Sequence, residues 1–180
     1  MTKQIFAVLV SAVLLFLWQF LSWSMLGVHQ DEYKYTPNQD KILEALNANL
    51  SENGDYFLPG VAPGTPMDQE QAFMENQAGK PWAKISYRKA FNTNMGMNLF
   101  RGFVADLAAA FLLVWLLMKA EKRSFSSAML SSLAVGFIGY LTIPYLDSIW
   151  YETKSIGFLI DSVVQWGLVG VWLGWWLPKR

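Results

Sequence analysis

The chain contains four long runs of apolar residues, and most polar positions lie between the first run and the second. The runs are Ile5–Val28, Leu99–Met118, Phe125–Leu146 and Ile156–Leu177. A helix needs roughly 20 mainly apolar residues to cross about 30 Å of hydrocarbon, and each run reaches that length. The pattern predicts an all-α integral membrane protein, a bundle of four transmembrane helices, in which Pro144 ends or kinks the third helix. The first run is long for a signal peptide and no small-residue cleavage pattern follows it, so we expect a retained anchor.

The polar segment 29–98 has a pattern of its own. Apolar residues recur at helical spacing after Pro37, at Ile42, Leu43, Leu46 and Leu50, and a second short helix is expected after Thr65–Pro66. Residues 82–87 alternate as in a strand, and residues 56–58 read as an extended piece that runs into turns. With one weak strand, we expect a small, mostly helical cap within a single membrane domain, 1–180.

Basic residues near the ends of the runs predict the orientation. They are Lys3, Lys119, Lys122, Arg123, Lys179 and Arg180, accompanied on that side by one acid, Glu121. The segment 29–98 carries nine acidic and six basic residues, and long loops count weakly in this comparison. Because Lys and Arg are retained on the cytoplasmic side, we expect both termini in the cytoplasm and 29–98 outside the membrane.

Composition narrows the classes of function. The chain has 14 basic and 14 acidic residues, 53% hydrophobic residues and only 16% charged ones, against about 25% charged in a typical soluble domain. A net charge of zero argues against a basic nucleic-acid binder. The absence of cysteine excludes disulfide scaffolds, Cys-based zinc sites, thiol nucleophiles and disulfide-forming quinone chemistry. A cysteine-free outer segment needs no oxidative folding, which favours a bacterial inner (plasma) membrane.

A few strongly polar residues interrupt the apolar runs and are the candidate binding residues. They are Gln19, Asn98, Arg101, Asp106, Asp161 and Gln165. At a rise of about 1.5 Å per residue, most of them fall in the outer half of the membrane. A charge in hydrocarbon costs at least about 2.5–3.5 kcal/mol on insertion scales, so these groups should face inward and pair. We expect an ion pair between Arg101 and Asp161, with Asp106 or Gln19 as the next neighbour.

This polar cluster has two interpretations. Buried polar contacts often hold membrane helices in register without doing chemistry. Alternatively, the cluster is a pocket open to the outside that binds a small molecule or a lipid headgroup, or that relays protons through Asp106 and Asp161. The sequence leaves both open.

Other site chemistries have less support. His29, Asp31 and Glu32 could donate metal ligands, but adjacent acids are usually solvated, and a lone histidine without cysteine does not make a strong zinc or haem site. There is no nucleophile elbow and no phosphate-binding glycine loop. We therefore expect no metal, no cofactor and no catalytic residues.

Small residues recur at every fourth position in the last two runs. Ala128, Ser132 and Gly136 do so in one run, and Gly170 and Gly174 in the other. Such faces let helix backbones approach closely. Packing within the bundle is the favoured interpretation, and a homo-oligomeric contact through Gly170 and Gly174 is the alternative.

The layout of spans and loops resembles that of claudin-type four-helix membrane proteins in topology only, since their outer-loop Trp and paired-Cys signature is missing here. We favour a non-enzymatic accessory or assembly protein whose outer segment engages another membrane or extracytoplasmic protein. The alternative is a protein that handles a small molecule, a lipid or protons, a minimal transporter or membrane enzyme, around Arg101, Asp106 and Asp161. A purely structural homo-oligomer is a third class. Beyond the lipid bilayer and such protein partners, no nucleic acid is expected.

Overall fold

The computed structural model is mostly helical and describes residues 2–120 and 124–178. The chain forms two compact units, one made of Met1–Lys34 and Asn94–Arg180 and the other of Tyr35–Thr93. Several residues that carried the orientation argument lie outside the described residues: Glu121, Lys122, Arg123, Lys179 and Arg180.

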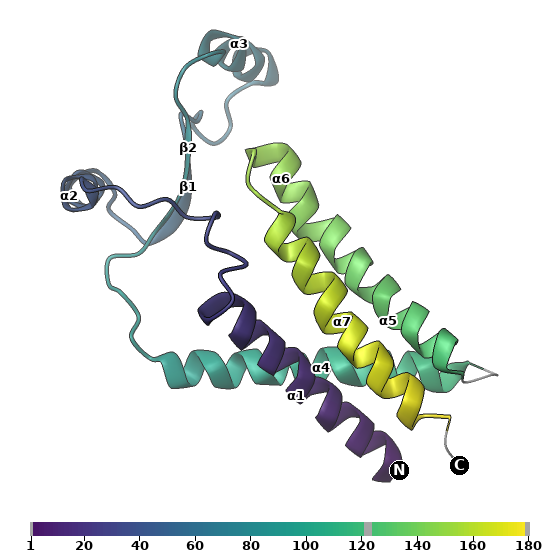
Figure 1. The fold of residues 1–180 in the computed structure, drawn as a ribbon. Helices are drawn as coiled ribbons and strands as arrows, with labels where there is room; N and C mark the ends of the chain where they lie inside the picture. The colour runs from purple at the N-terminus through teal and green to yellow at the C-terminus, as the bar shows by residue number, and fades with distance from the viewer. Residues whose placement is uncertain (1, 121–123, 179–180) are drawn as a thin grey trace. The chain divides into compact units, whose positions relative to one another are not determined.

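The first unit is built from four long helices (Figure 1). They are α1 (Thr2–Ser24), α4 (Met95–Lys119), α5 (Phe125–Tyr140) and α7 (Ile156–Trp176). Together with the continuation of α5, these are four helices long and apolar enough to cross a membrane. The structure thus confirms the four apolar helices in length and composition, with α1 ending four residues earlier than expected and α4 beginning four residues earlier.

The third helix does not end at Pro144. A π-helical turn, η1 (Leu141–Tyr145), contains the proline, and α6 (Leu146–Tyr151) continues the helix beyond it. Proline cannot donate a backbone hydrogen bond, and a wider π turn is one of the ways in which a helix accommodates such a break. The predicted end at Leu146 was therefore too early, and the span reaches Tyr151.

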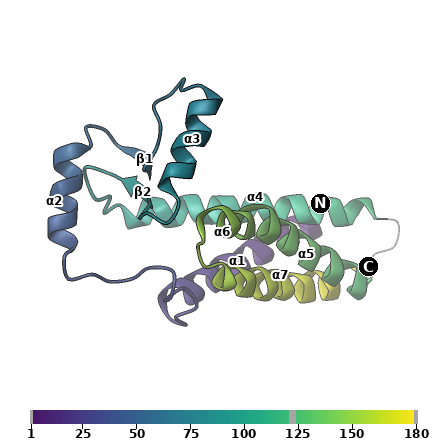
Figure 2. The same cartoon turned by 90° about the horizontal axis from the view of Figure 1, so that it is seen from above.

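Two helix pairs form the core of this unit, α1 with α4 and α5 with α7, and the contact between α1 and α7 joins them. Figure 2 shows α1 between α4 and α7. The buried side chains are mostly small or aliphatic, such as Ala12, Leu15, Ala110 and Val169. This arrangement puts α1 in contact with both helices that carry the polar candidates.

The small-residue faces pack α7 against α5. A Cβ atom at Gly170 would lie 2.9 Å from Sδ of Met129, and one at Gly174 would lie 2.8 Å from the Phe125 ring. Both glycines are buried. The close approach of these two helices thus depends on the absence of side chains there. A homo-oligomeric contact through the same glycines stays an untested prediction, and the intramolecular contact already covers them.

The outward surface of the long helices is apolar. Leu17 and Phe20 on α1 are each 50% exposed, and Ile143 is 71% exposed. Polar groups, including Ser11, Ser22 and Asp161, lie inside instead. This inverted distribution suits helices whose outer faces contact hydrocarbon.

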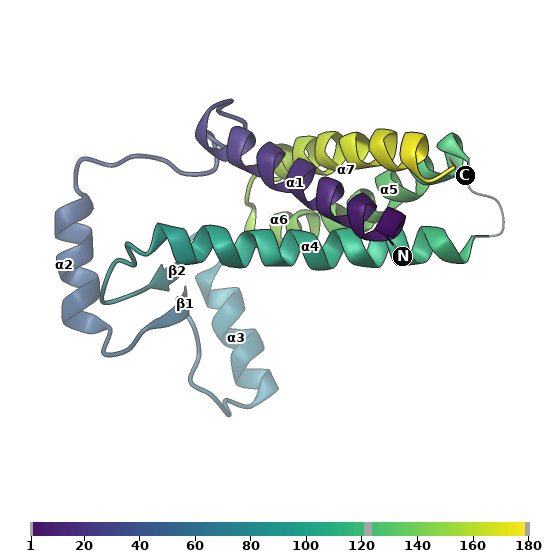
Figure 3. The same ribbon diagram turned by 90° about the horizontal axis from the view of Figure 1, so that it is seen from below.

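The second unit contains two short helices and a two-stranded antiparallel sheet. These elements are α2 (Gln39–Asn49), β1 (Gly54–Leu58), α3 (Met67–Gln77) and β2 (Ala83–Tyr87). The strands pair antiparallel, with Gly54 opposite Tyr87 and Leu58 opposite Ala83. Within this unit the two-stranded sheet lies between α2 and α3 (Figure 3). The two helices confirm the spacing argument. The expectation of a single weak strand was wrong, because residues 54–58 find their partner far along the chain.

Candidate functional site

A turn directly after α1 brings His29 to the end of α7. Gly27 has a φ of +65°, a left-handed backbone conformation that residues with a side chain adopt only with strain, so glycine suits this turn. Nζ of Lys154, just before α7, lies 3.6 Å from Oδ2 of Asp31 in the same segment. The chain after α1 is thereby held beside the first turns of α7.

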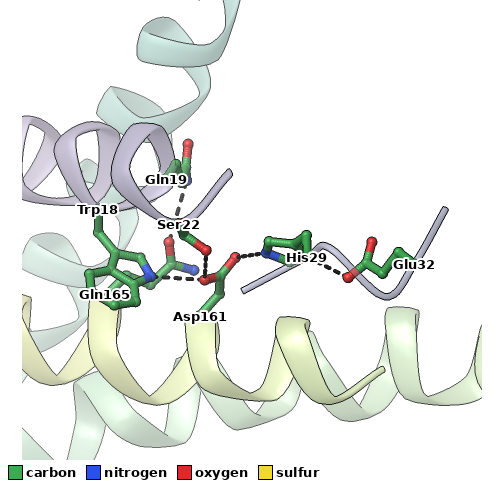
Figure 4. A network of polar contacts seen from close by, with 7 residues as sticks. All are labelled: Trp18, Gln19, Ser22, His29, Glu32, Asp161 and Gln165. Atoms are coloured by element: carbon green, nitrogen blue, oxygen red, sulfur yellow. Dashed lines mark hydrogen bonds and ion pairs between the residues drawn. The ribbon is translucent and has the colours of Figure 1, made fainter. Parts of the chain in front are cut away.

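Asp161 is the centre of the polar contacts in this unit (Figure 4). Its Oδ1 accepts hydrogen bonds from Nε1 of Trp18 at 2.9 Å and from Oγ of Ser22 at 2.5 Å. Its Oδ2 lies 2.9 Å from Nε2 of His29. Trp18 and Ser22 are one turn apart on α1, so a single helix face supplies two of the three partners. Asp161 is only 7% exposed, and these contacts satisfy both of its oxygens.

His29 lies between two carboxylates and two aromatic rings. Its Nδ1 contacts a carboxylate oxygen of Glu32, while its Nε2 contacts Asp161. The imidazole stacks on Trp23 with ring centroids 3.9 Å apart and planes 8° from parallel, and Phe158 meets it edge-on at 5.2 Å. These contacts fix the position and the plane of the ring.

The surroundings of His29 favour its protonated form. Burial alone would lower the pKa of this imidazole, but hydrogen bonds and charge interactions with Glu32 and Asp161 outweigh burial and raise the pKa above the ordinary value of 6.5. An imidazolium can donate to both carboxylates, whereas the neutral ring can donate to only one. The geometry also requires Gly157, where a Cβ atom would lie 2.8 Å from Nδ1 of His29.

A second polar cluster lies one helical turn further along α7. Nε2 of Gln19 donates to Oδ1 of Asp106 at 3.0 Å and lies 3.4 Å from Oε1 of Gln165. These three residues come from α1, α4 and α7, so the cluster connects all three helices. The other oxygen of Asp106 is buried and has no hydrogen-bond partner among the described residues.

The expected ion pair between Arg101 and Asp161 is not formed. Asp161 is occupied by partners from α1 and from the segment after it, while Arg101 is exposed and has no ion pair among the described residues. The reason is that α1 separates α4 from α7, so equal depth did not make the two residues neighbours. Asn98 is also exposed and belongs to neither polar cluster. Gln19 and Asp106, each expected as the next neighbour of that ion pair, contact one another instead.

Sequence reasoning did not place four members of the network around Asp161: Trp18, Ser22, and also His29 and Glu32, which it had considered only as metal ligands. The positions of Trp18 and Ser22, one turn apart, were a usable signal, since Ser22 follows the buried residues Ser11 and Leu15 along one stripe of α1. The role of His29 depends on the Gly27 turn and on a contact more than a hundred positions along the chain. No periodicity within one segment indicates such a contact.

The arrangement joins helices and can also bind a proton. Asp106, His29 and Asp161 are 5%, 6% and 7% exposed, so these three groups are buried, whereas Gln19 and Gln165 are half-buried. No group of three or more His, Asp and Glu side chains in residues 2–120 and 124–178 is placed to hold a metal ion. The chemistry available here is hydrogen bonding, and the His29 imidazole between Glu32 and Asp161 is the group whose surroundings favour a bound proton.

Comparison with known proteins gives this site no family context. No protein-family model, no curated protein and no solved structure matches the chain. The function is therefore argued from the residues and their geometry alone.

Proposed function

We propose that the protein is a non-enzymatic accessory or assembly protein of a bacterial inner membrane. In this proposal its four long helices span the membrane as a bundle and segment 35–93 docks onto a membrane or extracytoplasmic protein partner. Both termini lie in the cytoplasm and residues 29–98 outside, in keeping with the six basic residues against one acid on the terminal side.

The observation that carries the proposal is how little of segment 35–93 is buried. Tyr87 is the only buried residue among residues 35–93, and neither α2 nor α3 buries any side chain. Large apolar residues are exposed instead, including Tyr35 at 80%, Met67 at 84% and Phe91 at 93%. Two short helices and a two-stranded sheet do not bury enough apolar surface to be stable by themselves. A partner that covers these side chains would supply the missing burial.

Co-purification from membranes tests this proposal. The full chain is extracted in mild detergent after crosslinking and compared with Met67→Ser and Phe91→Ser, two changes at side chains that pack on almost nothing in the chain. We expect the same partner protein with the wild-type chain and a several-fold loss with each variant. The matched control is Glu52→Gln, at an exposed polar position of the same segment. Recovery of free monomer alone would contradict the proposal.

A second candidate function, proton handling, is favoured by two specific features. One is the buried Asp106 oxygen without a partner in the described residues, and the other is the His29 imidazole between Glu32 and Asp161. Carboxylates at different depths are what a proton path requires. Liposomes that contain the protein and an internal pH-sensitive dye distinguish the candidates. Proton flux that Asp106→Asn or Asp161→Asn abolishes, while the variants stay folded, would favour this second function. Flux equal to that of empty liposomes would exclude it.

A further inference from the structure

Arg101 is a cation without a counter-charge on a helix of the membrane-spanning type. It lies in the second turn of α4, is exposed, and makes no ion pair with any acidic residue in residues 2–120 and 124–178. The two acidic residues expected near Arg101 have other partners: Asp161 contacts His29, and Asp106 accepts a hydrogen bond from Gln19. An arginine near the end of a membrane helix extends toward the headgroup region, where phosphates are the available anions.

An open groove lies between α1 and α4, and its lining includes Gly102, the residue that follows Arg101 in the chain. It has a volume of about 450 Å³ and is lined mainly by apolar side chains, among them Phe16 and Trp23. Its few polar side chains are Gln19, Ser24 and Asn98. Gly102 also lines it, and a Cβ atom there would meet nothing within 4 Å, so the groove is empty at that point.

On α4, Arg101 is close in sequence to two residues that line the groove, Asn98 and Gly102. Arg101 directly precedes Gly102 and follows Asn98 by three positions, and residues three apart on a helix are neighbours. This part of the surface therefore combines an apolar slot, two carboxamides and a hydroxyl with a nearby residue in the chain, Arg101, whose guanidinium has no ion pair among the described residues. This is the pattern of an amphiphile with an anionic head, because guanidinium groups form paired hydrogen bonds with phosphate oxygens.

We propose that this groove binds one phospholipid, with an acyl chain between α1 and α4 and the phosphate on Arg101. The Asn98 carboxamide is the donor for the headgroup and ester oxygens, since the Ser24 hydroxyl already donates to the backbone oxygen of Phe20. None of the residues that line the groove belongs to segment 35–93, so this proposal neither requires the proposed docking role nor is required by it.

Native mass spectrometry of the full chain from nanodiscs tests the site. The probe lipid is phosphatidylglycerol, and diacylglycerol, which has the same chains without a phosphate, is the comparison. We expect retained phosphatidylglycerol on the wild-type chain, little diacylglycerol, and no displacement by inorganic phosphate. Arg101→Gln should lower retention about tenfold, the loss expected when one charge-assisted contact is removed, and Arg101→Lys should restore part of it.

A second variant tests the groove independently of the charge. Gly102→Leu fills the slot and should lower retention although Arg101 is unchanged. The matched controls are Gly139→Leu, where a Cβ atom also meets nothing within 4 Å, and Lys89→Gln, which removes an exposed base outside the long helices. Wild-type retention in both Arg101→Gln and Gly102→Leu, or equal losses in the controls, would overturn the proposal. Equal retention of diacylglycerol would also overturn it, since the phosphate would then play no part.

Discussion

His29 is the residue at which the environment and the chemistry of the network meet. It joins a carboxylate of the segment after α1, Glu32, to a buried carboxylate of α7, Asp161. Only the protonated ring can donate to both. The attachment of this segment to α7 therefore depends on protonation of a single group.

The pH dependence of stability follows from the raised pKa of His29. A raised pKa in the folded state adds stability that is fully present below the ordinary value of 6.5 and is lost as the pH rises through the raised value. We expect the wild-type chain to unfold at a higher temperature than His29→Gln. The difference in unfolding temperature should be largest just below pH 6.5 and smaller at alkaline pH. Tryptophan fluorescence on nanodisc samples measures this. A margin that grows with pH would contradict the role of the imidazolium.

A charge exchange between Arg101 and Asp161 tests whether Asp161 pairs with His29, as observed, and not with Arg101. Because α1 separates them, exchanging their charges in Arg101→Asp with Asp161→Arg should not rescue Asp161→Arg. An unpaired buried charge typically destabilises by about 3–5 kcal/mol, and the double variant should keep that loss. Denaturant unfolding of the three proteins measures it. Recovery of wild-type stability by the double variant would mean that the two residues are in contact after all.

At the scale of elements, what the sequence could predict depended on the range of the interactions. Helices form through local contacts, so local patterns indicated them. Helical spacing indicated α2, the Thr65–Pro66 start indicated α3, and the length of the apolar runs indicated the four long helices. Strand β1 was missed because it pairs with a strand beyond α3, and no pattern within residues 54–58 indicates that partner. The polar site was predicted in part for the same reason. Helical depth placed most of the polar candidates in the outer half of the membrane and matched Arg101 with Asp161. Depth does not tell which helices are neighbours, and the order of the helices decided the partner of Asp161.

The contact between α5 and α7 should be sensitive to added volume at one glycine and tolerant at another. Gly174→Leu would force side-chain atoms into Phe125 and should destabilise the protein by about 1–3 kcal/mol or more. Gly167→Leu on the same helix is the control, since a Cβ atom there meets only Leu133, at 3.9 Å. Unfolding and oligomeric state are measured together. Intact stability of Gly174→Leu with loss of an oligomer would show instead that this face binds a second copy.

At the scale of the whole molecule, the two units differ in how they satisfy their side chains. The long helices bury polar groups in closed contacts and present apolar residues outward, as a membrane allows. Segment 35–93 has almost no buried core, and its apolar residues are exposed. That difference is the physical basis for assigning anchoring to the first unit and partner binding to the second.

Photo-crosslinking in intact cells tests the docking role of segment 35–93 most directly. A photoreactive amino acid is placed at Phe91, which is 93% exposed, and at Glu52 as an exposed polar control. Docking through the apolar surface should give a discrete adduct with one other protein from Phe91 and none from Glu52. Absence of any adduct at Phe91, or the same diffuse labelling at both positions, would contradict the docking role.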